Sequence, residues 1–148
     1  MTHHPWLIAG GVLSLAAALL HIACIFGGAD WYRFFGAGER MARMAEAGQW
    51  TPAVFAVGIA GLLSLAAAYA FSGAGLIARL PLVRTGLVVV SAVYLARGIV
   101  ILKPSVMARP DLSSNFLFWS SLIVLTLGLV HLIGTWQAWP TLSQGKTH

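Results

Sequence analysis

Residues 6–27 read WLIAGGVLSLAAALLHIACIFG, an apolar stretch without a single charged side chain. About 20 mostly apolar residues are enough to carry an α-helix across the hydrocarbon core of a membrane. The stretch is too long and too rich in small residues for a simple signal peptide, and residues 1–5 lack the basic segment that precedes one. We therefore predict that the chain begins with a membrane-spanning helix.

Three more windows of the chain are almost free of charge. Residues 51–78 and 112–145 contain no charged residue, and residues 85–102 contain only Arg97. Charged residues make up 9% of the 148 residues and hydrophobic residues 59%, whereas globular proteins average about 25% charged. The sequence therefore predicts an all-α integral membrane four-helix bundle, with residues 1–148 as a single membrane domain. The predicted spans are about 6–27, 51–72, 83–102 and 115–136.

The tryptophans support this map of spans. All six fall at or near a predicted span end: Trp6, Trp31, Trp50, Trp119, Trp136 and Trp139. Amphipathic aromatic rings collect at the level of the lipid headgroups, where they form belts at both membrane surfaces. Their positions therefore mark where the predicted helices leave the membrane.

One connection, residues 28–50, is long enough to hold structure of its own. Apolar residues recur there at helical spacing, from Phe34 to Met41 and Met44. Glu39 precedes Arg43 by four residues, the order that favours an ion pair on a helix. We predict a short interfacial helix at about 34–47, which either folds back over the mouth of the bundle or serves as a plain linker.

An even number of spans places both termini on one side of the membrane. The connections 28–50 and 103–114 then lie on the other side, and a count of basic residues alone places them inside the cell. All four acidic residues also lie in these connections and offset most of that charge. The two tests disagree, so the orientation stays open, with a slight preference for cytoplasmic termini.

The net charge of +5 is spread over the chain and forms no basic patch of the kind that nucleic acid requires. We expect membrane lipids as partners instead, because the basic excess suits topology and contact with anionic lipids. Four short helices leave little room for an aqueous pore, so transport would require a homo-oligomer.

Each predicted span carries one stripe of small or polar residues, and close helix contact in lipid selects such residues. We expect all four stripes to face the interior of the bundle. They are Gly10, Ser14, Ala17, Ala18, His21, Cys24 and Gly28 on the first span, Gly61, Ser64 and Ala68 on the second, Val90, Tyr94, Arg97 and Ile101 on the third, and Ser120, Gly128, His131, Gly134 and Thr135 on the fourth.

Arg97 is the strongest single signal of function. An arginine inside a membrane costs about 2.5–3.5 kcal/mol even on insertion scales. Two alternatives stay open: its long side chain snorkels to the headgroups, or it faces inward and pairs with an acid, with Glu39 favoured over Asp30. The predicted ligand-binding residues, which lie at compatible heights, are His21, Tyr94, Arg97, Glu39, Asp30 and Ser120.

Other residues predict no catalytic, metal or cofactor site. His21 and His131 stand on antiparallel spans, and helical rise separates them by roughly 10 Å or more, too far for one haem iron. We expect His131 to hydrogen-bond a neighbouring helix. The single cysteine, Cys24, excludes an intramolecular disulfide and a dithiol mechanism. Motifs for phosphate-binding loops, zinc proteases and serine hydrolases are absent from the sequence.

The segment Asp30-Trp-Tyr-Arg-Phe-Phe-Gly-Ala-Gly-Glu39, together with the hydropathy of the whole chain, resembles small bacterial inner-membrane proteins of the DoxX-like group. The resemblance lies in size, layout and one segment rich in aromatic residues and glycine. It implies a four-helix bundle in a bacterial inner membrane. It implies no catalytic residue.

Three functions fit these observations. The first is a module that binds or transports a small polar or lipid-like molecule near His21, Tyr94 and Arg97. The second is an accessory subunit whose polar groups only orient its helices. The third is a membrane-embedded enzyme that acts on a lipid or quinone-like substrate, with His21 or Glu39 as acid or base and Arg97 as an electrostatic stabiliser. We favour them in that order.

Overall fold

The computed structural model describes residues 4–99 and 114–143, which form five α-helices and no strand. The helices are α1 (Pro5–Phe34), α2 (Glu39–Glu46), α3 (Thr51–Gly73), α4 (Val83–Ile99) and α6 (Ser114–Ser143). The all-α prediction is confirmed for these residues. Three helices, α1, α3 and α6, are long and apolar enough to cross a membrane. The predicted span 83–102 begins where α4 begins, and its residues 100–102 lie outside the described ranges.

The first helix is broken at the predicted end of its span. Gly28 has φ 69° and ψ −158°, a backbone conformation that is not helical and that glycine adopts readily. The residues after Gly28 return to helical geometry up to Phe34. The membrane-length part of α1 therefore ends at this kink, one residue after the predicted boundary at residue 27.

A short helix lies within the range 34–47, where an interfacial helix was predicted. Phe34 belongs to the end of α1, and α2 begins only at Glu39. Gly36 and Gly38 between them have φ of 68° and 91°, which interrupts a continuous helix. The predicted start was therefore wrong. The helical spacing of apolar residues gives no sign that two intervening glycines take positive φ and break the helix.

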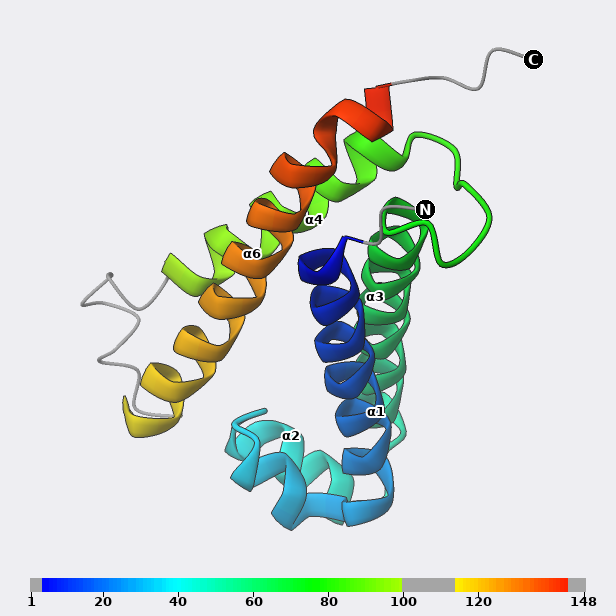
Figure 1. Cartoon of the computed structure of the whole chain (residues 1–148). Coiled ribbons are helices and arrows are strands. Elements are labelled where there is room, and N and C mark those ends of the chain that lie inside the picture. Colours follow the sequence, from blue (N-terminus) through cyan, green and yellow to red (C-terminus); the bar gives the residue numbers. More distant parts are fainter. Residues whose placement is uncertain (1–3, 100–113, 144–148) are drawn as a thin grey trace.

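The helices form two pairs, with α1 along α3 and α4 along α6 (Figure 1). The pairs meet near the start of α1 and the C-terminal half of α6, where a Cβ added to Gly134 would lie 2.9 Å from the backbone nitrogen of Leu7. The short α2 packs across the far ends of α1 and α3. His4 and Thr141 share a hydrogen bond of 3.2 Å, so α1 begins and α6 ends at the same end of the bundle.

Glycines allow α4 and α6 to approach closely. A Cβ at Gly98 would lie 2.7 Å from the Cα of Leu125, and a Cβ at Gly128 would lie 2.9 Å from the backbone nitrogen of Leu95. Real Cβ atoms essentially never approach within 3.0 Å of another heavy atom, so each position requires glycine. Small residues at such interfaces are what helix association in lipid requires.

The predicted inward stripes are confirmed on two helices and wrong on a third. On α1 and α6 the buried members are Gly10, Ser14, Ala18, Cys24, Gly128, His131, Gly134 and Thr135. On α3, Gly61 and Ser64 are exposed, and alanines such as Ala60 and Ala67 form the buried face instead. Small residues surround α3 on more than one side, so residue size alone did not identify its buried face. On α4, Tyr94 is buried, Arg97 is exposed, and Ile101 lies outside the described residues.

Candidate functional site

A buried polar contact joins α1 to α4 where the two helix pairs meet. The hydroxyl oxygens of Ser14 and Tyr94 lie 3.0 Å apart and share a hydrogen bond. Ser14 is fully buried, and Tyr94 is 8% exposed. Because hydrocarbon offers no hydrogen-bonding partner, pairing these two hydroxyls satisfies both at once. This hydrogen bond therefore fixes the position of α4 along the axis of α1.

His131 of α6 completes this junction of α1, α4 and α6. The edge of its ring meets the ring of Tyr94 at a centroid distance of 5.1 Å. Its Nδ1–H donates to the carbonyl of Leu127 at 2.9 Å, and because a carbonyl only accepts, Nδ1 carries the proton. Nε2 is then a fully buried acceptor without a hydrogen-bond partner among the described residues. The expected bond to a neighbouring helix is therefore wrong, since His131 bonds to its own helix.

Gly10 makes room for the imidazole. A Cβ at Gly10 would lie 2.8 Å from Cε1, 3.0 Å from Nδ1 and 3.2 Å from Nε2 of His131. The ring therefore packs flat against the backbone of α1, one turn before Ser14. We refer to Gly10, Ser14, Tyr94 and His131 as the polar junction.

Arg97 lies one turn beyond Tyr94 but outside the polar junction. Its Nη1 donates to the hydroxyl of Ser121 on α6 at 3.3 Å. Ser121 is 2% exposed, whereas Arg97 itself is exposed. No carboxylate of the described residues contacts this guanidinium. The predicted ion pair between Arg97 and Glu39 is therefore wrong, because Glu39 is bound elsewhere.

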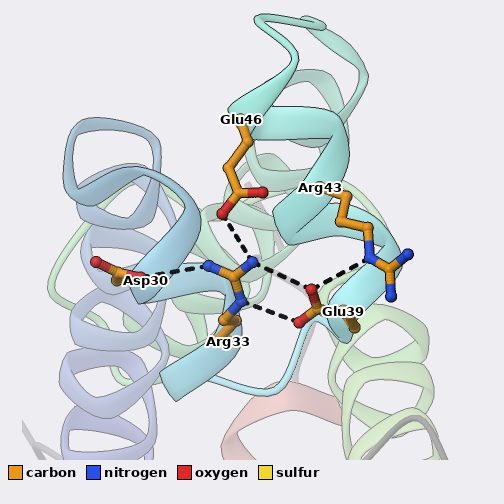
Figure 2. Close-up of polar contacts among 5 residues, drawn as sticks. All are labelled: Asp30, Arg33, Glu39, Arg43 and Glu46. Carbon is orange, nitrogen blue, oxygen red and sulfur yellow. Dashed lines mark hydrogen bonds and ion pairs between the residues drawn. The ribbon is translucent and has the colours of Figure 1, made fainter.

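Glu39 belongs to an exposed ion-pair cluster at the α2 end of the molecule (Figure 2). Arg33 stands at its centre, with nitrogen–oxygen distances of 2.9 Å to Glu39, 2.7 Å to Glu46 and 3.3 Å to Asp30. Arg43 adds the predicted contact within α2, from its Nε to Glu39 at 3.2 Å. We refer to these five residues as the α2 cluster.

The cluster changes the titration of Glu39. Hydrogen bonds from the Arg33 guanidinium, and then from that of Arg43, lower the pKa of its carboxyl from the ordinary 4.5 to about 2. These bonds stabilise the charged form. Glu39 therefore stays ionised through the whole physiological range, bound to two arginines, and is a poor general base.

The structure does not gather the predicted ligand-binding residues into one site. Tyr94 lies in the polar junction, Arg97 beside Ser121, and Asp30 and Glu39 in the α2 cluster. His21 is half-buried, and its Nδ1–H donates to the carbonyl of Ala17 at 2.8 Å. Ser120 is half-buried and donates to the carbonyl of Leu117 at 3.3 Å. Residues that were predicted to lie at the same height along their helices therefore do not contact one another.

Sequence reasoning did not assign three residues that make decisive contacts: Ser14, Ser121 and Arg33. Ser14 stands on a stripe with the right depth to meet Tyr94, so the signal was present. Ser121 follows Ser120 directly, and only the rotation of α6 decides which of the two faces Arg97. Arg33 lies close in sequence to Asp30 and Glu39, and the turn at Gly36 and Gly38 brings α2 back toward it.

Comparisons with known proteins leave the assignment of function to this geometry. No protein-family model matches the chain, and no curated protein and no solved structure is significantly similar to it. The likeness of residues 30–39 to the DoxX-like group therefore stays an expectation from the sequence. The function must be argued from the contacts described above.

Proposed function

We propose that the chain is a multi-pass bacterial inner-membrane protein that binds, and as a homo-oligomer transports, a small polar or lipid-like molecule. In this proposal α4 also crosses the membrane, as the third of four spans. Arg97 receives the anionic or polar end of the ligand, and Ser121 orients the guanidinium. The single observation that carries the proposal is the exposed Arg97 guanidinium on an apolar helix, whose contact among the described residues is with a neutral hydroxyl.

Arg97 has no carboxylate partner among the described residues. A charge on a membrane helix costs about 2.5–3.5 kcal/mol on insertion scales, and such charges usually pair or line a functional path. The acids of the described residues are engaged by Arg33 and Arg43 instead. Arginine has five N–H donors, and Nη1 uses one of them on Ser121. The remaining donors suit a carboxylate or phosphate held in a forked geometry.

An accessory subunit without a ligand is the second candidate, and the polar junction favours it. Ser14, Tyr94 and His131 are all buried, and Gly10 closes the space around the imidazole. These groups hold three helices together and pack closely around the imidazole. Under this alternative, Arg97 only snorkels toward the headgroups.

Ligand retention separates the two candidates. The protein is purified from membranes in a mild detergent, and native mass spectrometry measures binding of dodecyl phosphate and of uncharged dodecanol. We expect the wild type to retain the phosphate in preference to the alcohol. We expect Arg97→Gln to weaken phosphate binding by roughly 10-fold or more, because a hydrogen bond to a charged group contributes about 1.5–3 kcal/mol.

Arg84→Gln is the matched control, since it removes the same charge from the same helix at its other end. Arg84 stacks on Trp139, at 4.2 Å from the ring centroid. It lies near the start of α4, far along this helix from Arg97 and therefore far from Ser121, the partner of Arg97. Its replacement should leave dodecyl phosphate binding unchanged. Equal binding by the wild type and Arg97→Gln would contradict the proposal and support the accessory subunit.

A further inference from the structure

An open hollow of about 440 Å³ lies on the surface of α2, apart from both Arg97 and the polar junction. Its lining is Glu39, Arg40, Arg43, Met44 and Gln49. The residues that line the hollow thus carry two guanidiniums, one amide and one carboxylate. Such a lining suits an anion, provided that the donors are free and the carboxylate is itself bound by arginines.

Most of the side-chain donors around the hollow have no partner among the described residues. Arg40 is exposed and has no hydrogen-bond or ion-pair partner among the described residues. Arg43 uses only Nε, which donates to Glu39, and Figure 2 shows both of its terminal nitrogens directed away from Arg33. The side-chain amide of Gln49 likewise bonds to no described residue. Several side-chain N–H groups therefore belong to residues that line one hollow and have no acceptor among the described residues.

The one carboxylate of the lining is already bound by two guanidiniums. Arg33 donates to its two oxygens, at 2.9 Å and 3.1 Å, and Figure 2 shows Arg33 and Arg43 on opposite sides of Glu39. Arg33 itself does not line the hollow. Glu39 thus orients Arg43, and both of its oxygens accept hydrogen bonds from Arg33. What remains beside the hollow is the guanidinium of Arg40, which has no acidic partner among the described residues, and the two terminal nitrogens of Arg43.

The depth of the hollow identifies the source of the anion. The α2 helix lies between the kink of α1 at Gly28 and the start of α3 at Thr51, where both apolar helices end. Trp31 and Trp50 flank it and are 42% and 79% exposed, as expected of an aromatic belt at the headgroup level. Met44 gives the hollow one apolar wall. A phospholipid offers a phosphate and an adjoining apolar glycerol region at this depth.

We propose that this hollow binds the phosphate of an anionic membrane phospholipid, held by Arg40 and Arg43 with Gln49 as a neutral donor. The planar guanidinium matches two phosphate oxygens at once, which a lysine does not. The bound lipid would anchor α2 to the membrane surface beside the bundle. This inference is independent of the ligand proposed for Arg97, because the two sites share no residue.

Native mass spectrometry of the full chain in detergent tests the site with defined lipids. Phosphatidylglycerol and phosphatidylcholine with identical acyl chains are added at equal concentration. We expect the wild type to retain phosphatidylglycerol several-fold better, and Arg40→Gln and Arg43→Gln to lose most of this preference. Hydrogen exchange supplies the location: phosphatidylglycerol should slow exchange in residues 39–50 of the wild type and not of Arg40→Gln.

Arg40→Gln is the cleaner variant, since Arg40 forms no hydrogen bond or ion pair with the described residues that its loss would disturb. Arg84→Gln removes the same charge at the opposite end of the bundle and should preserve the lipid preference. Loss of the preference in Arg84→Gln as well would show a net-charge effect and overturn the site. Full retention by Arg40→Gln and Arg43→Gln would overturn it too. Displacement of the lipid by millimolar inorganic phosphate would show that the hollow takes free phosphate, which contradicts the lipid assignment.

Discussion

The polar junction and the α2 cluster hold their polar groups in opposite ways. The junction uses neutral groups, two hydroxyls and an imidazole, and buries them where three helices meet. The cluster uses five charged groups and leaves them exposed at one end of the bundle, with Asp30 93% exposed. Low dielectric surroundings make this division necessary, because a buried charge costs far more than a buried hydroxyl with a partner.

The difference indicates which region holds the bundle together. Exposed ion pairs contribute little to stability, because water screens them and long side chains lose entropy when they are fixed. Buried packing is sensitive to a single methyl group, since the interior has no spare space. Changes in the junction should therefore alter the stability of the whole bundle. Changes in the cluster should alter only the position of α2.

The largest effect is expected at Gly10. Gly10→Leu places a Cβ about 2.8 Å from Cε1 of His131 and extends a larger side chain beyond it, into a ring that cannot move away from Leu127 without losing its bond. Overpacking of this kind typically costs about 1–3 kcal/mol, and more where backbone must shift. Thermal unfolding in detergent, followed by circular dichroism, should show a clear decrease in the melting temperature.

Gly58→Leu is the matched control on α3. Gly58 also lies inside an apolar helix, but a Cβ there meets nothing within 4 Å. Leucine is a better helix former than glycine by nearly 1 kcal/mol, so the variant should unfold at the same temperature as the wild type or higher. Equal melting temperatures for Gly10→Leu and Gly58→Leu would mean that the junction does not determine stability.

A smaller effect is expected from the hydrogen bond between Ser14 and Tyr94. Interhelical hydrogen bonds in membranes contribute about 0.6 kcal/mol on average and up to about 1.7 kcal/mol. Tyr94→Phe and Ser14→Ala should each destabilise the bundle by about this amount, and the double variant should cost less than the sum, because either change alone removes the bond. A double-mutant cycle in unfolding free energy measures this coupling.

Tyr69→Phe serves as the control for the tyrosine. Its hydroxyl donates to the carbonyl of Pro81 at 3.4 Å in an exposed position, so its loss should change stability little. An additive cycle for Ser14 and Tyr94, or an equal effect of Tyr69→Phe, would contradict this prediction. The junction would then contribute to stability through packing and not through its hydrogen bond.

The sequence predicted the part of the fold that depends on composition. The absence of charge in 6–27 and 51–78 located α1 and α3, because exclusion of charge is what the hydrocarbon core demands. The kink at Gly28 falls one residue past a predicted boundary. The inward stripe on α3 could not be identified, since alanine, glycine and serine are similarly small and several faces of that helix carry them.

The contacts of the site were less predictable, because they depend on the rotation of each helix. Tyr94 and Arg97 do lie near one face of α4, as helical geometry predicts. The rotation of α4 about its axis nevertheless buries the tyrosine and leaves the arginine exposed. The partner of Glu39 depended on the turn before α2. Two glycines with positive φ direct the chain back toward Arg33. Arg33 therefore binds the Glu39 carboxylate, which Arg97 was expected to bind.

The smallest effect on the whole molecule is expected from acid pH, and it should be confined to α2. The folded-state pKa of Glu39 is about 2, below the ordinary 4.5. A lowered pKa means that the ion pair stabilises the docked helix fully above about pH 4.5, and that this contribution is lost as the pH falls toward 2. Below that range Arg33 loses its two-oxygen partner, while the packing of Ala42 against Cys24 and Tyr32 stays in place.

A spin label at Ala47→Cys, on a Cys24→Ala background, reports the mobility of α2 by electron paramagnetic resonance. We expect an immobile label from pH 7 down to about 4.5 and increasing mobility between there and pH 2, while the helical content of the bundle stays constant. Glu39→Gln should already be more mobile than the wild type at pH 7, because its neutral amide forms no ion pair with Arg33, and of the described ion pairs between α1 and α2 the one from Arg33 to Glu46 remains. Asp30→Asn should behave like the wild type, since Asp30 is almost fully exposed and lies at the longest distance from Arg33. A label that stays immobile down to pH 2 would show that the apolar contacts of Ala42, and not the ion pairs, hold α2 in place, and the two regions would then depend on packing alike.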